Sequence, residues 1–340
     1  MRESDAAWLV ADIGGTNLRF AIASPGVDGR PALRQVRSLS AAAFNSLVHA
    51  TRSYLQGLDV EVQGAVVSVA GRVIDGAVRM TNLPWTINAI ELAHALSLHC
   101  VEIVNDLAAA AAALPVLRAD EAQLLWSSDP LRPRAGTRRC AIIGAGTGLG
   151  IAGAMIEGMR VRVLDTEGGH AAYAPQTAQE EAIAQALGIR FGRVSWERVV
   201  SGPGLANIYR ALAGTGPDDA TPTPELIVAS AQDGTDVRGS LAVGLFSQAP
   251  AAVAGDCVLM QGAWDGVYLM GELLQVTRPW LDHPAFRSRF TDKGPFADSM
   301  ESVPVRLITH TQPVLMGAAC IAMTKYERAL SVAPAAEALI

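Results

Sequence analysis

Short apolar runs alternate with helical segments along the first third of the chain. The runs predict strands at residues 9–12, 19–23, 34–39, 64–69, 78–81 and 101–104, and the segments between them predict helices at 42–56, 89–98 and 106–114. Three successive strands followed by strand–helix alternation are typical of an α/β domain built on a mixed sheet.

The same order of elements begins again after a polar, proline-containing link at residues 127–139. Strands are expected at residues 141–144, 150–156, 160–164, 267–270 and 305–308, and helices are expected to begin at Ala178, Leu205, Pro224, Val237 and Pro313. The pattern therefore predicts a duplicated mixed-sheet unit whose second copy carries a helical insertion.

Composition allows a large core and argues against several classes of partner. The 340 residues are 50% hydrophobic and 18% charged, which is enough for two domains with ample buried surface. The net charge of −6 is spread along the chain, so nucleic acid is not expected as the main partner. The four cysteines are scattered without a CxxC pair or a close Cys/His cluster, which excludes a standard zinc site and predicts buried free thiols in a reducing compartment.

The most apolar long stretch, residues 241–260, is interrupted by Gln248, Pro250 and Asp256. These residues favour a buried helix, kinked at the proline, over a membrane span. The N-terminal sequence MRESDAAW is acidic as well as basic and lacks the pattern of a signal peptide. We expect a soluble, cytoplasmic protein with no membrane partner.

Two glycine-rich turns of similar design stand at matching places in the two halves. The first is Asp12-Ile13-Gly14-Gly15-Thr16-Asn17, and the second is Gly144-Ala145-Gly146-Thr147-Gly148-Leu149-Gly150. Each lies between apolar runs, which predicts a strand, a tight turn and a strand. Glycines let the backbone turn its N–H groups toward an anion, and the threonine adds a hydroxyl donor. Together the turns can hold a polyphosphate from both sides of a cleft.

Simpler interpretations of the turns remain open for each turn alone. Neither is a P-loop, because no Lys-Ser/Thr pair follows the glycines, and neither fits G-x-G-x-x-G. An ordinary hairpin explains either turn equally well, since glycines are common at hairpin tips. The pair favours phosphate binding, and Asp12 beside the first turn is then a candidate to hold Mg²⁺ through waters.

Polar residues at two further places could supply the rest of a site. Asn105 and Asp106 follow a strand, where ligands gather in open α/β sheets, although helix capping alone would also explain them. The loop at residues 165–170 places Glu167 and His170 around two glycines, and Glu197 follows downstream. Each of these could be an unremarkable surface group, but together they form the set of acceptors and donors that a sugar requires.

These motifs resemble the bacterial glucokinase family, the ATP-dependent type of hexokinase within the actin-like sugar-kinase superfamily. The matching segments run nearly the whole chain: DIGGTNLRFAIA at 12–23, MTNLPW at 80–85, ND at 105–106, GAGTGLG at 144–150, EGGHAAYAP at 167–175, VSWERVVSGPGLANIYRA at 194–211 and DKGPF at 292–296. The related repressor and open-reading-frame kinases follow their Glu-Gly-x-His segment with a cysteine-rich zinc motif. This chain lacks that motif, which favours the glucokinase branch.

The resemblance implies a two-lobed actin-like (ribonuclease H-like) ATPase fold, with duplicated α/β domains around a cleft. We expect a small α/β domain of residues 1–116 plus 311–340 and a large one of residues 117–310 with the helical insertion. By resemblance, Asp106 is the catalytic base, and a homodimer is implied. The implied ligands are glucose, bound by Asn105, Asp106, Glu167, His170 and Glu197, and ATP with Mg²⁺, bound by Asp12, Gly14, Gly15, Thr16, Asn17, Gly146, Thr147, Gly148 and Gly271.

One residue departs from the family pattern. Similar members carry two glycines before the helix that lines the adenosine pocket, whereas this chain has Gly271-Glu272. Glu272 places a side chain where backbone should approach the nucleotide.

The expected reaction is transfer of the ATP γ-phosphoryl group to the 6-hydroxyl of glucose, a step of glycolysis. Two alternatives remain at this point: a kinase of mannose, fructose or an amino sugar, and a sugar-binding sensor with weakened catalysis because of Glu272.

Overall fold

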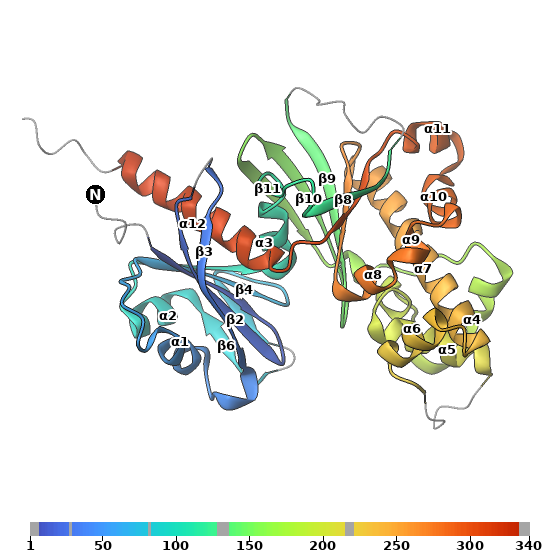
Figure 1. Ribbon diagram of the computed structural model, residues 1–340, viewed down its shortest axis with the longest axis horizontal. Coiled ribbons are helices and arrows are strands. Elements are labelled where there is room, and N and C mark those ends of the chain that lie inside the picture. The colour runs from blue at the N-terminus through green and yellow to red at the C-terminus, as the bar shows by residue number, and fades with distance from the viewer. Residues whose placement is uncertain (1–6, 27–28, 81–82, 128–135, 215–220, 333–340) are drawn as a thin grey trace, which may run out of the picture. The chain divides into compact units, whose positions relative to one another are not determined.

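The chain forms two compact units, each described here by itself. The computed structural model (Figure 1) describes residues 7–26, 29–80, 83–127, 136–214 and 221–332. Unit 1 comprises Met1–Leu117 with Thr311–Ile340, and unit 2 comprises Arg118–His310.

Unit 1 is a five-stranded mixed sheet with helices. Its elements are β1 (Trp8–Ile13), β2 (Asn17–Ser24), β3 (Ala32–Ser40), η3 (Ala41–Ala43), α1 (Leu47–Leu55), β4 (Gly64–Val69), the small pair β5 (Ala77–Arg79) and β6 (Thr86–Asn88), α2 (Ala89–Leu96), β7 (Cys100–Asn105), α3 (Asp106–Ala112) and α12 (Pro313–Val332). The strand order is β3-β2-β1-β4-β7. Strands β1, β2 and β3 form an antiparallel meander, and β4 and β7 run parallel to β1.

Strand β1 is apolar from Trp8 to Ala11 because both of its faces are buried there. Leu9 and Ala11 join the core cluster on one face, which includes Tyr54 of α1. Trp8 and Val10 join a second cluster on the other face, where α12 supplies Leu315 among others. Side chains alternate across a strand, so a strand covered on both faces needs an uninterrupted apolar run. Helix α12 thus completes the unit in which the chain begins (Figure 1).

Unit 2 repeats this strand order and adds to it. Its elements are β8 (Ala122–Trp126), β9 (Arg138–Ala145), β10 (Leu149–Glu157), β11 (Arg160–Thr166), η4 (Gly168–His170), α4 (Ala178–Phe191), η5 (Trp196–Arg198), α5 (Gly202–Ala213), α6 (Pro224–Gln232), α7 (Val237–Gln261), β12 (Val267–Met270), α8 (Glu272–Val276), α9 (Arg278–Leu281), α10 (Pro284–Thr291), η6 (Gly294–Phe296), α11 (Ala297–Met300) and β13 (Val305–Ile308). The sheet order is β11-β10-β9-β12-β13-β8. The meander β9–β10–β11 followed by parallel β12 and β13 matches β1–β2–β3 with β4 and β7, which confirms the predicted duplication.

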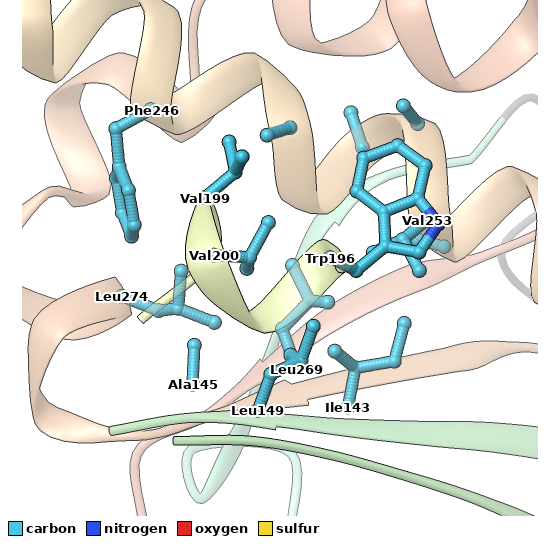
Figure 2. Close-up of a cluster of buried hydrophobic side chains, with 14 of the residues drawn as sticks. Ile143, Ala145, Leu149, Trp196, Val199, Val200, Phe246, Val253, Leu269 and Leu274 are labelled. Carbon is cyan, nitrogen blue, oxygen red and sulfur yellow. The ribbon is translucent and has the colours of Figure 1, made fainter. Parts of the chain in front are cut away.

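Helix α7 is the centre of the unit 2 core. It is long and apolar enough to cross a membrane by length and composition, but 67% of its most apolar window is buried inside the protein. Pro250 lies within it, as predicted, and is buried. Figure 2 shows Phe246 and Val253 of α7 facing a layer that contains Trp196 and Val199, with strand residues such as Ile143 beneath. The η5 segment is therefore fixed between helix and sheet.

Several predicted boundaries were wrong. The helix expected at residues 42–56 begins only at Leu47, because the Ser46 side chain accepts the His49 N–H and caps it there. The helix expected at 89–98 ends at Leu96, since Ser97 adopts a left-handed conformation with φ 56°. Strand β8 and the short helices α8 to α11 were not predicted at all. Part of the strand expected at 78–81 and part of the link at 127–139 lie outside the described residues.

All four cysteines are free thiols, as predicted, but only Cys140 and Cys257 are fully buried. Burial raises the pKa of both thiols to about 12, so they stay protonated at neutral pH.

A buried ion pair ties α4 to α10 in unit 2. Both carboxylate oxygens of Glu180 accept from Arg289 Nη2, at 3.1 and 2.9 Å, and the two side chains are only 7% and 8% exposed. Glu180 also closes the capping box of α4 by accepting the N–H groups of Gln176 and Thr177. Removing the guanidinium would leave a buried carboxylate without its counter-charge.

We therefore expect Arg289→Met to lower the free energy of unfolding by about 3–5 kcal/mol, the cost of breaking a buried pair. The matched control is Arg287→Met in the same helix as Arg289. It removes an exposed ion pair with Glu301 and should lower the free energy of unfolding by less than about 1 kcal/mol. Urea denaturation followed by circular dichroism measures both. Equal losses in the two variants would contradict the proposed role of the buried pair.

Candidate functional site

The carboxyl ends of three parallel strands in unit 1 lie at one edge of its sheet. In the strand register, Asp12 pairs with Ser68, and Ser68 pairs with Val104. One position further on, Ile13, Val69 and Asn105 form the next row. The first glycine turn and the Asn105–Asp106 pair therefore leave the same edge of the same sheet, which is where open α/β sheets bind ligands.

The first glycine turn is a tight hairpin between β1 and β2, as predicted. The Gly14 N–H donates to the Asn17 carbonyl at 3.0 Å, and the Thr16 carbonyl accepts the Ala41 N–H at 2.8 Å. These bonds fix the turn at both ends. The side chains of Thr16 and Asn17 are exposed, so the hydroxyl can face a ligand.

Asp12 is largely buried beside this turn. Its Oδ2 accepts from Arg19 Nη1 at 3.1 Å, and its side chain is 15% exposed. Burial raises the pKa of Asp12, and the Arg19 charge and hydrogen bond oppose that effect without cancelling it. The Ser68 hydroxyl in the same row is buried and has no hydrogen-bond partner among the described residues. A carboxylate next to an unsatisfied hydroxyl favours a cation or its waters.

Asn105 is the N-cap of α3. Its Oδ1 accepts the N–H groups of Leu107 at 2.8 Å and Ala108 at 3.1 Å, and its Nδ2 donates to the Gly71 carbonyl at 3.2 Å. The capping interpretation is therefore correct for Asn105. Asp106 is the first residue of α3, and its Oδ1 accepts the same Leu107 N–H at 2.8 Å. Asn105 therefore caps the helix, and the Asp106 carboxylate is held at the helix start.

The second glycine turn joins β9 and β10 and is tied to the start of α5. Gly146 N–H donates to the Gly148 carbonyl at 2.9 Å, and Gly202 N–H donates to the Gly146 carbonyl at 2.8 Å. The hairpin prediction is confirmed here too. Because Gly202 is the first residue of α5, the turn lies at a helix N-terminus, where partial positive charge favours anions.

A cavity of about 630 Å³ opens beside this turn. It is bordered by the first residues of α5, α6 and α8, so three helix N-termini meet there. Its lining is Gly146, Thr147, Gly202, Pro203, Ala206, Pro224, Glu225, Val228, Ala229, Gln232, Glu272, Leu273 and Val276. Such a mostly apolar slot with a few polar groups has the size of a small-ligand site.

Glu272 is exposed and lines this cavity, and Gly271 before it cannot be replaced. Gly271 has φ +118°, and a Cβ there would overlap the Ala145 carbonyl oxygen. The sequence analysis missed Glu225 and Gln232, which also line the cavity. Hydrogen bonding to Thr223 lowers the pKa of Glu225, so this second carboxylate is charged at neutral pH. The signal for Glu225 was its place after Pro224 at a helix start.

Glu197 lies against the second glycine turn. Its Oε2 accepts the Leu149 N–H at 3.1 Å, and its Oε1 is 3.9 Å from His170 Nδ1. The segment of Glu167 and His170 packs closely on the same strand, because a Cβ at Gly169 would overlap the Leu149 carbonyl oxygen. Glu197 and His170 are thus brought together beside Leu149, and Glu167 bridges to Ile151 of the same strand. Ser201 fixes the next turn by donating to the Glu197 carbonyl at 2.8 Å.

The candidate residues accordingly form two groups, one in each unit. Asp12, the first turn, Asn105 and Asp106 belong to unit 1, and the second turn, Gly271 and the Glu167, His170 and Glu197 group belong to unit 2. No cluster of three or more His, Cys, Asp or Glu side chains suited to bind a metal directly occurs within the described part of the chain. A cation at Asp12 would therefore rely on waters for its other ligands.

A family model described as glucokinase matches residues 9–325. The glucokinase of Xylella fastidiosa (strain M23) is 40% identical over 328 residues, which cover 95% of this chain and 96% of the relative. A crystal structure of glucokinase from an Antarctic psychrotroph superposes with a TM-score of 0.83 at 30% identity, covering 94% of this chain and 99% of that one. The glucokinase of Balamuthia mandrillaris, solved in complex with glucose, has a TM-score of 0.76 at 21% identity and covers 93% of each chain.

These likenesses confirm the predicted fold class. The mixed α/β architecture with its repeated strand order is that of sugar kinases with the actin-like ATPase fold.

The bond between Glu197 and Leu149 can be tested through Gly148. A Cβ at Gly148 would lie 2.7 Å from Glu197 Oε2, so Gly148→Ala should push the carboxylate off the Leu149 N–H. We expect hydrogen exchange of the Leu149 amide to accelerate about tenfold, corresponding to roughly 1.4 kcal/mol of lost hydrogen bonding. Gly146→Ala, whose Cβ would meet nothing within 4 Å, is the control in the same turn. Unchanged exchange in Gly148→Ala would exclude this bond in solution.

Proposed function

The chain belongs to the glucokinase family, and we propose that it transfers the γ-phosphoryl group of ATP to the 6-hydroxyl of glucose, giving glucose 6-phosphate and ADP. One observation carries the proposal most directly. The second glycine turn lies between the 630 Å³ cavity on one side and the Glu197–His170 pair on the other. A phosphate-binding turn thus stands next to both a nucleotide-sized slot and a set of polar groups suited to a sugar.

Glucose would be bound by Glu167, His170 and Glu197 of unit 2 and by Asn105 and Asp106 of unit 1. Ionised carboxylates accept hydrogen bonds from sugar hydroxyls, and the imidazole can donate or accept. Glu197 is already oriented by the Leu149 N–H, so one of its oxygens is fixed before a sugar arrives. Pre-oriented partners lose less freedom when the ligand binds.

ATP would place its base and ribose in the cavity and its phosphates on the two glycine turns. The apolar walls formed by Pro203, Val228 and Leu273 suit a purine ring. The helix N-termini around Gly146 and Thr147 supply N–H groups and partial positive charge for the phosphates. Gly14, Gly15, Thr16 and Asn17 are the corresponding groups of unit 1.

Asp12 and Ser68 fit a hydrated Mg²⁺. The Asp12 side chain is largely buried, and the neighbouring Ser68 hydroxyl has no partner among the residues described. When bound, Mg²⁺ would offset negative charge on the ATP phosphates. Arg19 keeps Asp12 oriented toward the edge where the turn begins.

Asp106 is the proposed general base. As glucose O6 attacks the γ-phosphorus, the Asp106 carboxylate takes the hydroxyl proton, the new O6–P bond forms, and the bond from phosphorus to the β–γ bridging oxygen breaks. The start of α3 holds the carboxylate in place through the Leu107 N–H. Phosphoryl transfer depends mainly on such positioning and on charge stabilisation.

The alternatives are less well supported. The hypothesis of a sugar sensor with weakened catalysis rests on Glu272 alone. The relatives at 40% identity are glucokinases, which favours the kinase. Phosphorylation rates across a panel of hexoses would test whether another sugar is the substrate.

We further propose that the protein is an ATP-dependent enzyme of glycolysis. It acts in the cytoplasm as a homodimer, without a nucleic-acid or membrane partner.

Asp106→Asn should lower kcat for glucose phosphorylation by about 10²–10⁴-fold, the usual contribution of a general base. Glucose binding, measured by calorimetry, should change little because the amide keeps most hydrogen-bonding capacity. Asp75→Asn removes an exposed carboxylate of the same unit and should leave kcat unchanged. Near-normal turnover of Asp106→Asn in a coupled assay would remove Asp106 as the base.

Glu272→Gln should lower the KM for ATP about two- to fivefold at low salt, because it removes a negative charge beside the nucleotide anion. The KM for glucose should not move. The gain should shrink as salt is added, since exposed charges are screened. Glu181→Gln, an exposed glutamate of the same unit outside the cavity, is the control. A KM for ATP that rises in Glu272→Gln would instead assign the carboxylate to binding the nucleotide.

A further inference from the structure

A second cavity in unit 2, of about 510 Å³, lies between α4 and α5. Its walls come from the C-terminal half of α4 and from α5, and it shares no lining residue with the cavity beside the second glycine turn. Leu187, Ile189 and Ala211 provide an apolar surface, and Arg190 and Arg210 provide charge. Ile189 is 90% exposed, which is unusual for so large an apolar side chain.

Arg190 and Arg210 line this cavity, and Arg198 lies beside Arg190. Partial loss of hydration is the main cause that lowers the pKa of Arg190, and repulsion from Arg210 and Arg198 lowers it further. The guanidinium groups of Arg190 and Arg198 both lie over the Phe191 ring, at 4.7 and 4.1 Å from its centroid. Among the described residues, no carboxylate lies within 4.0 Å of Arg190 or Arg198 to form an ion pair. Such a group of like charges is stabilised when an anion joins it.

The arginines are held in place before any ligand binds. Arg190 Nη1 donates to Asn207 Oδ1 at 3.0 Å, and Asn207 Nδ2 donates to the Arg198 carbonyl at 3.0 Å. Asn207 is only 6% exposed and lines the cavity, so it is a buried amide that fixes a charged neighbour. Arg210 Nε donates to Thr221 Oγ1 at 2.8 Å, which orients its guanidinium as well. Fixed guanidinium groups match the oxygens of a phosphate.

We propose that this cavity binds a small organic phosphate, with the phosphate group on Arg190 and Arg210 and the remainder of the molecule against Leu187, Ile189 and Ala211. Guanidinium N–H groups can donate to the oxygens of a phosphate monoester, and the volume admits a molecule of a few carbon atoms beside it. The site is separate from the residues proposed for glucose and ATP, so it does not depend on the proposed kinase activity.

Paired charge variants test the site in solution. The full chain, saturated with glucose and a non-hydrolysable ATP analogue to occupy the glycine turns, is titrated calorimetrically with inorganic phosphate and with glycerol 3-phosphate at constant ionic strength. We expect Arg190→Gln to weaken binding of both at least tenfold. Arg193→Gln, an exposed arginine of the same unit outside the cavity, removes the same charge and should change the affinity less than twofold. Equal affinities in the two variants would overturn the proposal.

Two further measurements separate binding from folding and locate the anion. Arg190→Lys keeps the charge without the planar fork and should bind with intermediate affinity, while circular dichroism stays unchanged in all three variants. Crystals soaked in selenate, a phosphate mimic with anomalous scattering, should show a peak between Arg190 and Arg210 that is absent in Arg190→Gln. Anomalous peaks confined to the glycine turns would overturn the assignment.

Discussion

The hairpin between β9 and β10 leaves no space for side chains at three glycines in and around it, and this constraint organises the site. A Cβ at Gly169 or Gly271 would overlap the backbone carbonyl of Leu149 or Ala145, and a Cβ at Gly148 would press on the Glu197 carboxylate. Because backbone packs directly on backbone, the segments carrying His170 and Glu272 are brought against the same turn as Glu197. The layer of Trp196, Val199 and Val200 in Figure 2 holds this arrangement from the other side. The polar groups are thus positioned by close packing, which resists displacement more strongly than surface hydrogen bonds would.

The two units use the same strand order for different chemistry. In unit 1 the parallel edge of β1, β4 and β7 carries Asp12 and the Asn105–Asp106 pair. In unit 2 the corresponding strands β9 and β12 end at the second glycine turn and at Gly271, and helices α5, α6 and α8 add the walls of the cavity. Duplication therefore supplies two glycine hairpins, whereas the proposed base and the candidate cation site come from one copy and the proposed nucleotide cavity comes from the other.

The sequence predicted what local chemistry determines. Both hairpins, the repeated strand order and the buried helix with Pro250 follow from glycine turns and apolar runs. Strand β8 was missed because it pairs with β13, far away in sequence, and α8 to α11 because each is too short for a periodic pattern. Glu225 and Gln232 were missed because only the folded insertion brings α6 beside Gly146. The contact of Lys293 in the DKGPF motif also needed the structure: its Nζ is buried and bonds Asp256 at 2.7 Å, which ties the motif to the core helix α7.

Helix α5 connects the two cavities of unit 2. Its first residues, Gly202 and Pro203, border the 630 Å³ cavity, while Asn207 and Arg210 further along border the second cavity. Leu205 and Ile208 are fully buried, so the 12-residue helix is anchored in the core of unit 2. Asn207 also holds the carbonyl of Arg198, the residue after Glu197. A ligand that shifts Arg190 away from Asn207 would therefore act on the η5 segment through a single side chain, and on the second glycine turn through the Gly202–Gly146 hydrogen bond. Hydrogen bonds thus link the second cavity to the residue beside Glu197, and the same helix to the second glycine turn.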